Sequence, residues 1–335
     1  MDEHARARLA EWLTGAAGMP IAITRMALLS GGAIQQNWAL DVTVGGTAQR
    51  WVLRTDNATV LSASLPRPAE FALLQAAFNA GVAVPQPLFC CADPGVTGAP
   101  FFVMQRVAGL AQGHRLARQA AGMGGDRALA EALGRELARI HTIRPPRPEL
   151  AFLGTPPADP ARAFIARQRT ALDAAGTPRP VLEWGLRHLE RTAPPPPENL
   201  VLNHNDFRIG NIMLTESRVT AVLDWEFAAW GDPHADLGWL CAPCWRFGNR
   251  SLEAGGIGPR DAFYRGYEAE SGSRIDPARV AWWELAGTIR WAVIAADQAA
   301  RHLSGKERSL ELALTGHIVP ELEMDVLRMT GTLHA

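Results

Sequence analysis

Acidic and amide side chains cluster in one short segment, and a second acidic cluster follows it. The segment at 203–213 reads NHNDFRIGNIM and holds Asp206 and Asn211 five residues apart, and LDWEF at 223–227 adds Asp224. Carboxylate and amide oxygens bind Mg²⁺ together with phosphate oxygens and water. The residue types therefore indicate metal-assisted chemistry on a phosphate, in which Asp206 faces a substrate hydroxyl while Asn211 faces the metal.

The elements around this cluster must bring its members together. Residues 200–206 read as a buried strand that ends in a loop, and residues 211–225 read as two strands around a tight turn. A hairpin of this length returns the chain close to its starting point. We therefore expect Asp224 beside Asn211, with Asp206 a loop's width away.

The alternative is that HNDFRIGN is a polar turn, because Asp and Asn are common turn residues. The hairpin, the second Asp at its end and the segment GDPHADLGWL directly after it favour a functional site. The spacing of Asp206 and Asn211 is that of a kinase catalytic loop, with a base Asp, four residues and a metal-binding Asn. His204 matches the leading His of that loop, and we expect it to brace the loop. Asp224 matches the metal-binding Asp, with Trp225 and Glu226 in place of the usual Phe-Gly.

HNDFRIGNIM followed by AVLDWEFAAWGDPHADLGWL resembles the phosphotransferase family that includes aminoglycoside and choline kinases. The family usually has His-Gly-Asp, and here Asn205 takes the glycine position, where asparagine tolerates a positive φ. The segments LSGG, RWVLR, AEFALLQAAFNAGVAVPQPL, GAPFFVMQRVAG, LARIHTI and LAFLG also match in register, so the resemblance covers nearly the whole chain. Within the family, the chain most resembles kinase-like domains related to those attached to certain acyl-CoA dehydrogenases.

The resemblance implies an α+β, bilobal protein-kinase-like fold. Residues 1–106 would form a small β-rich lobe with one key helix that binds nucleotide. Residues 107–335 would form a larger, mainly helical lobe with the catalytic loop, the metal site and the acceptor-binding helices.

Local sequence patterns predict the elements of these two parts. Strands are expected over 25–56 in three runs, and as a pair at 84–91 and 100–107 around the turn residues ADPGVTGA. A proline-rich connecting loop is expected at 144–160. Helices are expected at 2–16, 68–80, 128–141, 161–174, 180–191 and in the tail from 259.

The resemblance also assigns nucleotide-binding residues by position. A loop over the phosphates would be formed by Ser30, Gly31 and Gly32, because small residues let backbone N–H groups approach. A Gly-Gly pair alone is more typical of an ordinary hairpin turn. The adenine pocket and the hinge beside it would be formed by Val103, Met104, Gln105, Arg106 and Val107.

Arg54 falls where kinases carry the strand lysine that holds the α- and β-phosphates, and Glu70 would be its helix partner. Arginine keeps the charge and presents two donors to phosphate, but it is bulkier than lysine and not equivalent to it. The alternative is a surface arginine on a strand edge.

The implied reaction transfers a phosphate from ATP, or from GTP as an alternative donor, with Mg²⁺, to a hydroxyl of a small molecule. An antibiotic, a hydroxyacyl thioester or another metabolite would be the acceptor. We place Arg208 and Glu226 near the acceptor. Asp236 is expected to anchor the catalytic loop from behind, and His141 to be a packing residue.

Two rival functions use the same fold. One is a catalytically weak or inactive nucleotide-binding regulatory module, favoured by Arg54 in the lysine position. The other is a protein kinase, but the chain lacks a full GxGxxG, and GDPHADLGWL begins only seven residues after Asp224. That spacing leaves no room for a peptide-binding activation segment, so a small-molecule acceptor is favoured.

Composition excludes several other classes of function. The 335 residues suffice for roughly two domains, and the formal net charge of −1 gives no general electrostatic attraction to nucleic acid or anionic lipid. No apolar run approaches the ~20 residues that span a bilayer, and the first residues lack a signal-peptide core, so we expect a cytoplasmic protein. Cys241 and Cys244 form a CxxC, but no second CxxC or HxxxH lies nearby to complete a zinc site, so a metal or redox role is not favoured. Cys90 and Cys91 follow an apolar strand-like run, where cysteine is usually a small apolar residue.

Overall fold

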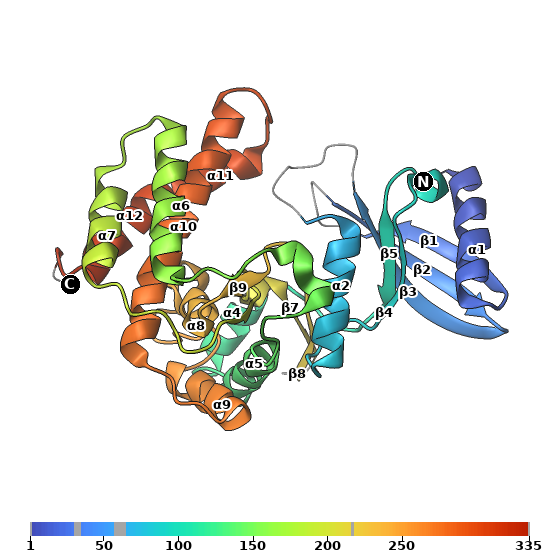
Figure 1. Ribbon diagram of the computed structural model, residues 1–335, viewed down its shortest axis with the longest axis horizontal. Helices are drawn as coiled ribbons and strands as arrows, with labels where there is room; N and C mark the ends of the chain where they lie inside the picture. Colours follow the sequence, from blue (N-terminus) through green and yellow to red (C-terminus); the bar gives the residue numbers. More distant parts are fainter. Residues whose placement is uncertain (1, 30–34, 57–64, 216–217, 334–335) are drawn as a thin grey trace. The chain divides into compact units, whose positions relative to one another are not determined.

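A computed structural model describes residues 2–29, 35–56, 65–215 and 218–333, and it contains two compact units (Figure 1). Unit 1 comprises Met1–Leu110, Arg147–Gly154 and Ile212–Ala228. Unit 2 comprises Ala111–Pro146, Thr155–Asn211 and Ala229–Ala335. Two later segments of the chain therefore join the N-terminal part in unit 1. The assignment of nucleotide binding to residues 1–106 and of acceptor binding to the rest stays a prediction.

The centre of unit 1 is a five-stranded antiparallel sheet in the order β1-β2-β3-β5-β4. Its strands are β1 (Ile21–Leu28), β2 (Gln35–Val44), β3 (Thr47–Asp56), β4 (Pro87–Cys91) and β5 (Phe101–Gln105). The three predicted strands and the strand pair are thus present. The first strand begins at Ile21, four residues before the predicted run.

Helix α1 (Glu3–Ala17) covers one face of this sheet (Figure 1). The helix begins after Asp2, whose carboxylate accepts the Ala5 N–H at 2.7 Å, and it ends at Gly18, which has a φ of +65°. Leu9 and Leu13 are fully buried against apolar side chains of the sheet. The helical spacing of these residues explains why the predicted helix forms here.

Helix α2 (Arg67–Asn79) lies on the opposite face of the sheet (Figure 1). Pro68 occupies its first turn, and Leu73 and Leu74 are buried. Phe71 packs against Phe102 of β5, with ring centroids 5.9 Å apart. The helix was predicted at 68–80, within one residue of its observed bounds.

Two short helices occupy segments that were predicted as turn and loop. They are α3 (Pro94–Thr97) and the 3₁₀ helix η1 (Pro148–Leu153). Asp93 accepts the Gly95 N–H at 2.8 Å, and each helix has a proline in its first turn. Prolines and turn residues predict a break in longer elements, but they equally suit the start of a single helical turn.

The hairpin that follows the candidate loop also belongs to unit 1. Strands β7 (Ile212–Thr215) and β8 (Arg218–Val222) pair antiparallel, with Ile212 opposite Val222. The Val222 N–H donates to Ala83 O at 2.7 Å, which ties the hairpin to the segment after α2. The predicted hairpin is therefore present, and it delivers Asp224 two residues after its last strand.

Unit 2 is mainly helical, and its core forms around the long helix α10. Its helices are α4 (Gly113–Gly122), α5 (Arg127–Ile140), α6 (Pro160–Ala175), α7 (Pro180–Arg191), α8 (Pro233–Cys241), α9 (Arg260–Ser271), α10 (Pro277–Leu303), α11 (Leu310–His317) and α12 (Val319–Met329). The helices predicted at 128–141, 161–174 and 180–191 agree with α5, α6 and α7 to within one residue. Among the described residues, no helix is both long and apolar enough to span a membrane.

A small two-stranded sheet in unit 2 positions the candidate loop. Strand β6 (Val201–Asn203) pairs antiparallel with β9 (Ala229–Gly231), a strand that the sequence patterns did not predict. The loop with Asp206 follows β6, and α8 follows β9. The sheet therefore brings the start of α8 to the base of the loop.

Candidate active site

The loop after β6 is held by a buried carboxylate on α8. Asp236 accepts the His204 N–H at 2.7 Å and the Asn205 N–H at 2.8 Å, and it also accepts from the Asn203 side-chain amide at 3.3 Å. Its side chain is fully buried. Burial alone would raise the pKa of Asp236, but the hydrogen bond and charge of His141 and the contacts with His204 outweigh burial and lower it. Asp236 thus occupies the anchoring position expected for it.

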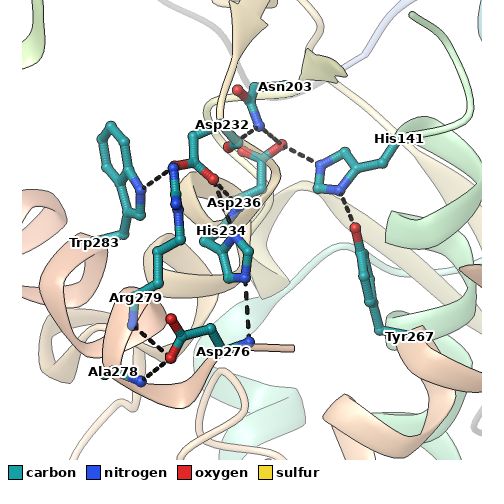
Figure 2. Close-up of polar contacts among 10 residues, drawn as sticks. All are labelled: His141, Asn203, Asp232, His234, Asp236, Tyr267, Asp276, Ala278, Arg279 and Trp283. Atoms are coloured by element: carbon teal, nitrogen blue, oxygen red, sulfur yellow. Dashed lines mark hydrogen bonds and ion pairs between the residues drawn. The ribbon is translucent and has the colours of Figure 1, made fainter. Parts of the chain in front are cut away.

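His141 belongs to the same buried network (Figure 2). Its Nδ1 lies 2.9 Å from the Tyr267 hydroxyl and its Nε2 lies 3.3 Å from Asp236 Oδ2. The His141 ring therefore supports the anchor, in line with the packing role predicted for it.

Asp232 forms a second ionic anchor beside Asp236 (Figure 2). Its Oδ2 accepts from the Trp283 indole at 3.0 Å and from Arg279 Nε at 2.6 Å, and its Oδ1 accepts the His234 N–H at 2.9 Å. Burial opposes ionisation, but the hydrogen bonds from His234 and Arg279 prevail and lower the pKa of Asp232 to about 2. These contacts fix the start of α8 against α10.

The backbone at the start of the loop is left-handed. Asn205 has a φ of +61°, as expected for a residue in the glycine position of the family motif. This turn allows the Asp206 N–H to donate to His204 Nδ1 at 3.2 Å. His204 therefore braces the loop, as the sequence comparison with kinase loops predicted.

Several donors surround the Asp206 carboxylate, which is nearly buried at 9% exposure. Asn211 Nδ2 donates to Asp206 Oδ2 at 2.5 Å and to the Asp206 carbonyl at 3.0 Å. Arg208 Nε lies 3.1 and 3.2 Å from the two carboxylate oxygens, and Trp239 Nε1 donates to Oδ1 at 3.1 Å. Asp206 and Asn211 are thus in direct contact within unit 2, and the carboxylate has a fixed orientation.

Two residues that sequence reasoning missed support this loop from the helices. Trp239 lies on α8, and Arg290 on α10 donates to the Asn205 carbonyl at 2.7 Å. The Arg290 guanidinium also stacks over the Trp239 ring at 4.7 Å. Trp239 belongs to the segment GDPHADLGWL, but that pattern does not indicate which residue the indole contacts, and Arg290 belongs to no motif. Both contacts form only on folding. Arg208 is stacked in the same way over Trp245, at 4.9 Å.

Arg54 is the centre of a charge network in unit 1. The contact predicted between Arg54 and Glu70 is present, with Arg54 Nε 2.9 Å from Glu70 Oε1. Arg54 Nη2 also lies 2.8 Å from Asp224 Oδ1, and Asp224 has a left-handed φ of +69°. Burial alone would lower the pKa of Arg54, but the charges of Glu70 and Asp224 outweigh burial and raise it. Arg54 is buried at 8% exposure, so the surface-arginine alternative is wrong.

Arg67, another residue that the sequence patterns did not single out, extends this network. Its Nε lies 2.9 Å from Asp56 Oδ1, and its Nη1 is ion-paired with Glu70 Oε2. Arg67 is almost fully buried, so Glu70 lies between two arginines. The position of Glu70 is therefore fixed on both sides.

The structure corrects one assignment on β5. Val103 is fully buried in the core beneath α1, together with Phe101, whereas Phe102 faces α2. Side chains alternate between the faces of a strand, so Val103 lies on the face opposite Arg54. The prediction that Val103 shares the adenine pocket with Met104 is wrong. Met104 pairs with Val52, two residues before Arg54, and therefore belongs to the Arg54 face.

The other predicted residues have varied placements. The Gln105 N–H donates to Gln86 O at 2.8 Å, and Val107 is half-buried. Glu226 is half-buried and follows the Asp224 turn. The predicted phosphate loop, Ser30, Gly31 and Gly32, lies outside the described residues.

The proposed metal ligands belong to different units, Asn211 to unit 2 and Asp224 to unit 1. Their joint metal site stays a prediction. Over the described part of the chain, no group of three or more His, Cys, Asp or Glu side chains could hold a metal ion. Burial raises the pKa of the Cys241 thiol to about 12, which disfavours the thiolate that a redox or zinc site needs.

The chain is similar to known proteins both in sequence and in structure. Residues 25–283 match the phosphotransferase enzyme family. Acyl-CoA dehydrogenase family member 11 from Gallus gallus is 37% identical over 174 residues, which are 50% of this chain and 22% of that protein. This chain covers about a third or less of the length of the curated relatives that it matches.

Solved structures share the fold at low identity. A candidate aminoglycoside phosphotransferase from Ralstonia eutropha has a TM-score of 0.71 at 21% identity, covering 98% of this chain and 99% of the other. A thermostable mutant of aminoglycoside phosphotransferase APH(4)-Ia, in a ternary complex with AMP-PNP and hygromycin B, has a TM-score of 0.62 at 16% identity, covering 96% and 98%. The predicted α+β kinase-like fold is thereby confirmed. With more than half of its length matched, the chain belongs to the phosphotransferase enzyme family.

Proposed function

We propose that this protein transfers the γ-phosphate of ATP, with Mg²⁺, to a hydroxyl of a small molecule. The observation that carries the proposal is the Asp206 carboxylate, which is oriented by Asn211, Arg208 and Trp239 on a loop anchored to Asp236. In the reaction the acceptor oxygen bonds to the γ-phosphorus while the bond from that phosphorus to ADP breaks. The hydroxyl proton passes to Asp206.

The chemistry of Asn211 and Asp224 suits Mg²⁺. Asn211 donates its amide N–H to Asp206, so its carbonyl oxygen is directed away from that contact. Asp224 offers a second oxygen ligand. Mg²⁺ is usually bound by one or two protein oxygens and otherwise by phosphate oxygens and water, so a set without a third acidic ligand fits it. When bound, the ion would neutralise charge on the phosphates.

We assign the nucleotide phosphates to Arg54. Its guanidinium is held by Glu70 through Nε and by Asp224 through Nη2, and its permanent positive charge suits phosphate oxygens. We further assign the phosphate loop to Ser30, Gly31 and Gly32. The edge of the adenine ring would contact the segment that contains Met104, Gln105 and Val107. GTP stays an alternative donor.

The ligand complexes of structural neighbours support this proposal. APH(4)-Ia was solved with AMP-PNP and hygromycin B, and spectinomycin phosphotransferase APH(9)-Ia with ADP and spectinomycin. These proteins bind a nucleotide together with a small molecule. We infer the same two classes of ligand here, with Arg208 and Glu226 near the acceptor.

The second candidate is a catalytically weak nucleotide-binding module, favoured by Arg54 where a lysine is usual. Turnover separates the two functions. A screen of hydroxylated metabolites and antibiotics for ADP release should find an acceptor that raises the rate well above acceptor-free hydrolysis, and EDTA should abolish the gain. Nucleotide binding without stimulation by any acceptor would favour the regulatory module.

A further inference from the structure

A cavity of about 90 Å³ lies in unit 2 beside the Asp206 loop. Asn205 forms part of its wall, and so does Trp239, whose indole N–H donates to Asp206. The volume is several times that needed for one water molecule. The cavity can therefore hold a small polar group of a ligand beside the loop that carries the proposed base.

Two arginines from different helices line this cavity, Arg167 on α6 and Arg290 on α10. Arg290 uses one nitrogen for the Asn205 carbonyl and rests its plane on Trp239. The guanidinium carbon of Arg167 lies 5.9 Å from the centre of the Phe164 ring. Within the described ranges, neither arginine forms an ion pair with a carboxylate.

The direction of their pKa shifts distinguishes Arg167 and Arg290 from the arginines that form ion pairs. Carboxylate partners raise the pKa of Arg54, Arg139 and Arg169. Burial instead lowers the pKa of Arg167, although the residue is exposed to solvent. Burial also lowers the pKa of Arg290; the charges of Asp206 and Asp236 oppose this effect, and the charge of Arg167 adds to it. Two like charges thus face one cavity, and an anion between them would relieve their repulsion.

The acids on the cavity wall do not supply that anion, because each is already engaged (Figure 2). Asp232 accepts from Arg279 and Trp283, and Asp236 accepts from two backbone N–H groups of the loop. The negative charges of Asp232 and Asp236 are therefore compensated by the groups that hold α8 and the loop in place. The cavity therefore presents two cationic side chains and aromatic surface to a ligand.

We propose that this cavity is an oxyanion subsite for the acceptor, which carries a carboxylate or a phosphate group in addition to its reactive hydroxyl. This inference rests on the proposed function, because it places the anionic end of the acceptor at Arg167 and Arg290 while the hydroxyl lies at Asp206. Guanidinium groups recognise both anions through paired N–H donors. A cationic acceptor such as choline or an aminoglycoside would be repelled there.

Binding can be measured without catalysis. Isothermal titration calorimetry, in the absence of nucleotide, would compare hydroxycarboxylates of increasing chain length with their uncharged amides, and glycerol 3-phosphate with glycerol. We expect at least one anion to bind about tenfold or more tightly than its neutral counterpart. The carboxylate and phosphate arms identify which oxyanion the subsite takes. Equal binding of charged and neutral counterparts, or binding of neither, would overturn the proposal.

The Arg167→Gln variant should weaken binding of the anionic ligand about fivefold or more, and Arg167→Lys should retain most of the affinity. Arg162→Gln is the matched control, because Arg162 lies on the same helix with its side chain 79% exposed and does not line the cavity. It should bind like the wild type. If Arg167→Gln and Arg162→Gln behave alike, the subsite is wrongly placed.

Phosphotransfer assays then separate this proposal from the proposed function. Turnover of a hydroxycarboxylate or phosphate ester, with a higher KM in Arg167→Gln and an unchanged KM for ATP, supports both. Turnover only of neutral or cationic acceptors would overturn the subsite and leave the kinase function standing. Arginine-dependent anion binding without phosphotransfer to any bound hydroxyl would retain the subsite and contradict the proposed function.

Discussion

Asn205 shows how a single residue shapes the candidate loop. Its left-handed backbone brings both the His204 and Asn205 N–H groups onto Asp236. A residue with a Cβ but no short polar side chain pays about 1–2 kcal/mol in this conformation, whereas glycine does not. The residue type at this position therefore controls the geometry of the segment that carries Asp206.

Replacing Asn205 tests that reasoning, because Asn205→Gly and Asn205→Ala both remove the amide and differ only by a Cβ. We expect Asn205→Ala to have a free energy of unfolding about 1 kcal/mol below that of Asn205→Gly. Urea denaturation of the two variants measures the difference. Equal stability would show that the left-handed conformation is not required.

Asp232 should make stability depend on acid pH. Its folded pKa of about 2 lies below the unfolded value of 3.8, so the ionised group stabilises the fold above pH 3.8, and this contribution is lost as the pH falls toward 2. Since one pKa unit corresponds to about 1.4 kcal/mol, Asp232→Asn should cost about 2 kcal/mol at pH 7. The difference in the free energy of unfolding between the wild type and Asp232→Asn should narrow as the pH falls from 5 toward 2.

The control for this pH series is Asp173→Asn, which changes an exposed acid near the end of α6. It should follow the wild type at every pH. If the stability difference between the wild type and Asp232→Asn stayed constant with pH, the buried carboxylate would not ionise as described.

At the residue scale, the sequence predicted the contacts that motifs encode and missed those that folding creates. The Arg54–Glu70 pair and the anchoring by Asp236 follow positions in known motifs. The contacts of Trp239 and Arg290 with the loop were missed, because the motif that contains Trp239 does not indicate its partner and Arg290 lies in no motif. The Val103 error had a different origin, because a motif position was carried over without the alternation of side chains along a strand.

Helices α5 and α9 illustrate what an element requires from its residues. A Cβ at Gly134 would lie 2.1 Å from the Phe263 carbonyl, and a Cβ at Gly266 would lie 2.0 Å from the Glu131 carbonyl. Both distances are too short for any side chain, so the two helices approach to backbone contact. The close approach depends on glycine at both positions.

Gly134→Ala should therefore force α5 and α9 apart and lower the free energy of unfolding by about 2–3 kcal/mol. Gly122→Ala is the control, since a Cβ at this exposed helical glycine would meet nothing within 4 Å. It should leave stability unchanged or raise it by up to about 1 kcal/mol. Thermal and urea unfolding would measure both variants, and a neutral Gly134→Ala would contradict the described packing.

The elements themselves were largely predictable, because their signals are local. Helical spacing with prolines and glycines at the ends predicted α2, α5, α6 and α7 to within one residue. The three-residue strand β9 was missed, since so short a run has no detectable alternation. The short helices α3 and η1 were missed because their proline-rich sequences are also typical of turns.

At the scale of the whole molecule, residues of one site are drawn from distant parts of the chain. Asp224 reaches Arg54 across 170 positions, and it does so because the β7–β8 hairpin belongs to unit 1. The bilobal fold was predictable only through family resemblance, since composition and periodicity alone do not specify which segments join. The acceptor cavity was not predictable, because its two arginines lie 123 positions apart on separate helices.

Nucleotide binding should stabilise the folded protein by mass action. ADP with Mg²⁺ at about 100 times its Kd should raise the free energy of unfolding by about 2.7 kcal/mol, and the melting temperature by several degrees. Differential scanning fluorimetry with and without EDTA tests this expectation. A shift of the same size in EDTA would contradict a role for the metal in holding the nucleotide, and no shift at all would contradict nucleotide binding.

The most direct test of the central claim is phosphotransfer by Asp206→Asn, measured as labelled product from γ-labelled ATP beside the nucleotide Kd. Loss of a positioned general base typically costs 10²–10⁴-fold in rate. We predict that kcat falls at least about a hundredfold while the nucleotide Kd changes by less than about twofold. Phosphotransfer near the wild-type rate would contradict the assignment of Asp206 as the base.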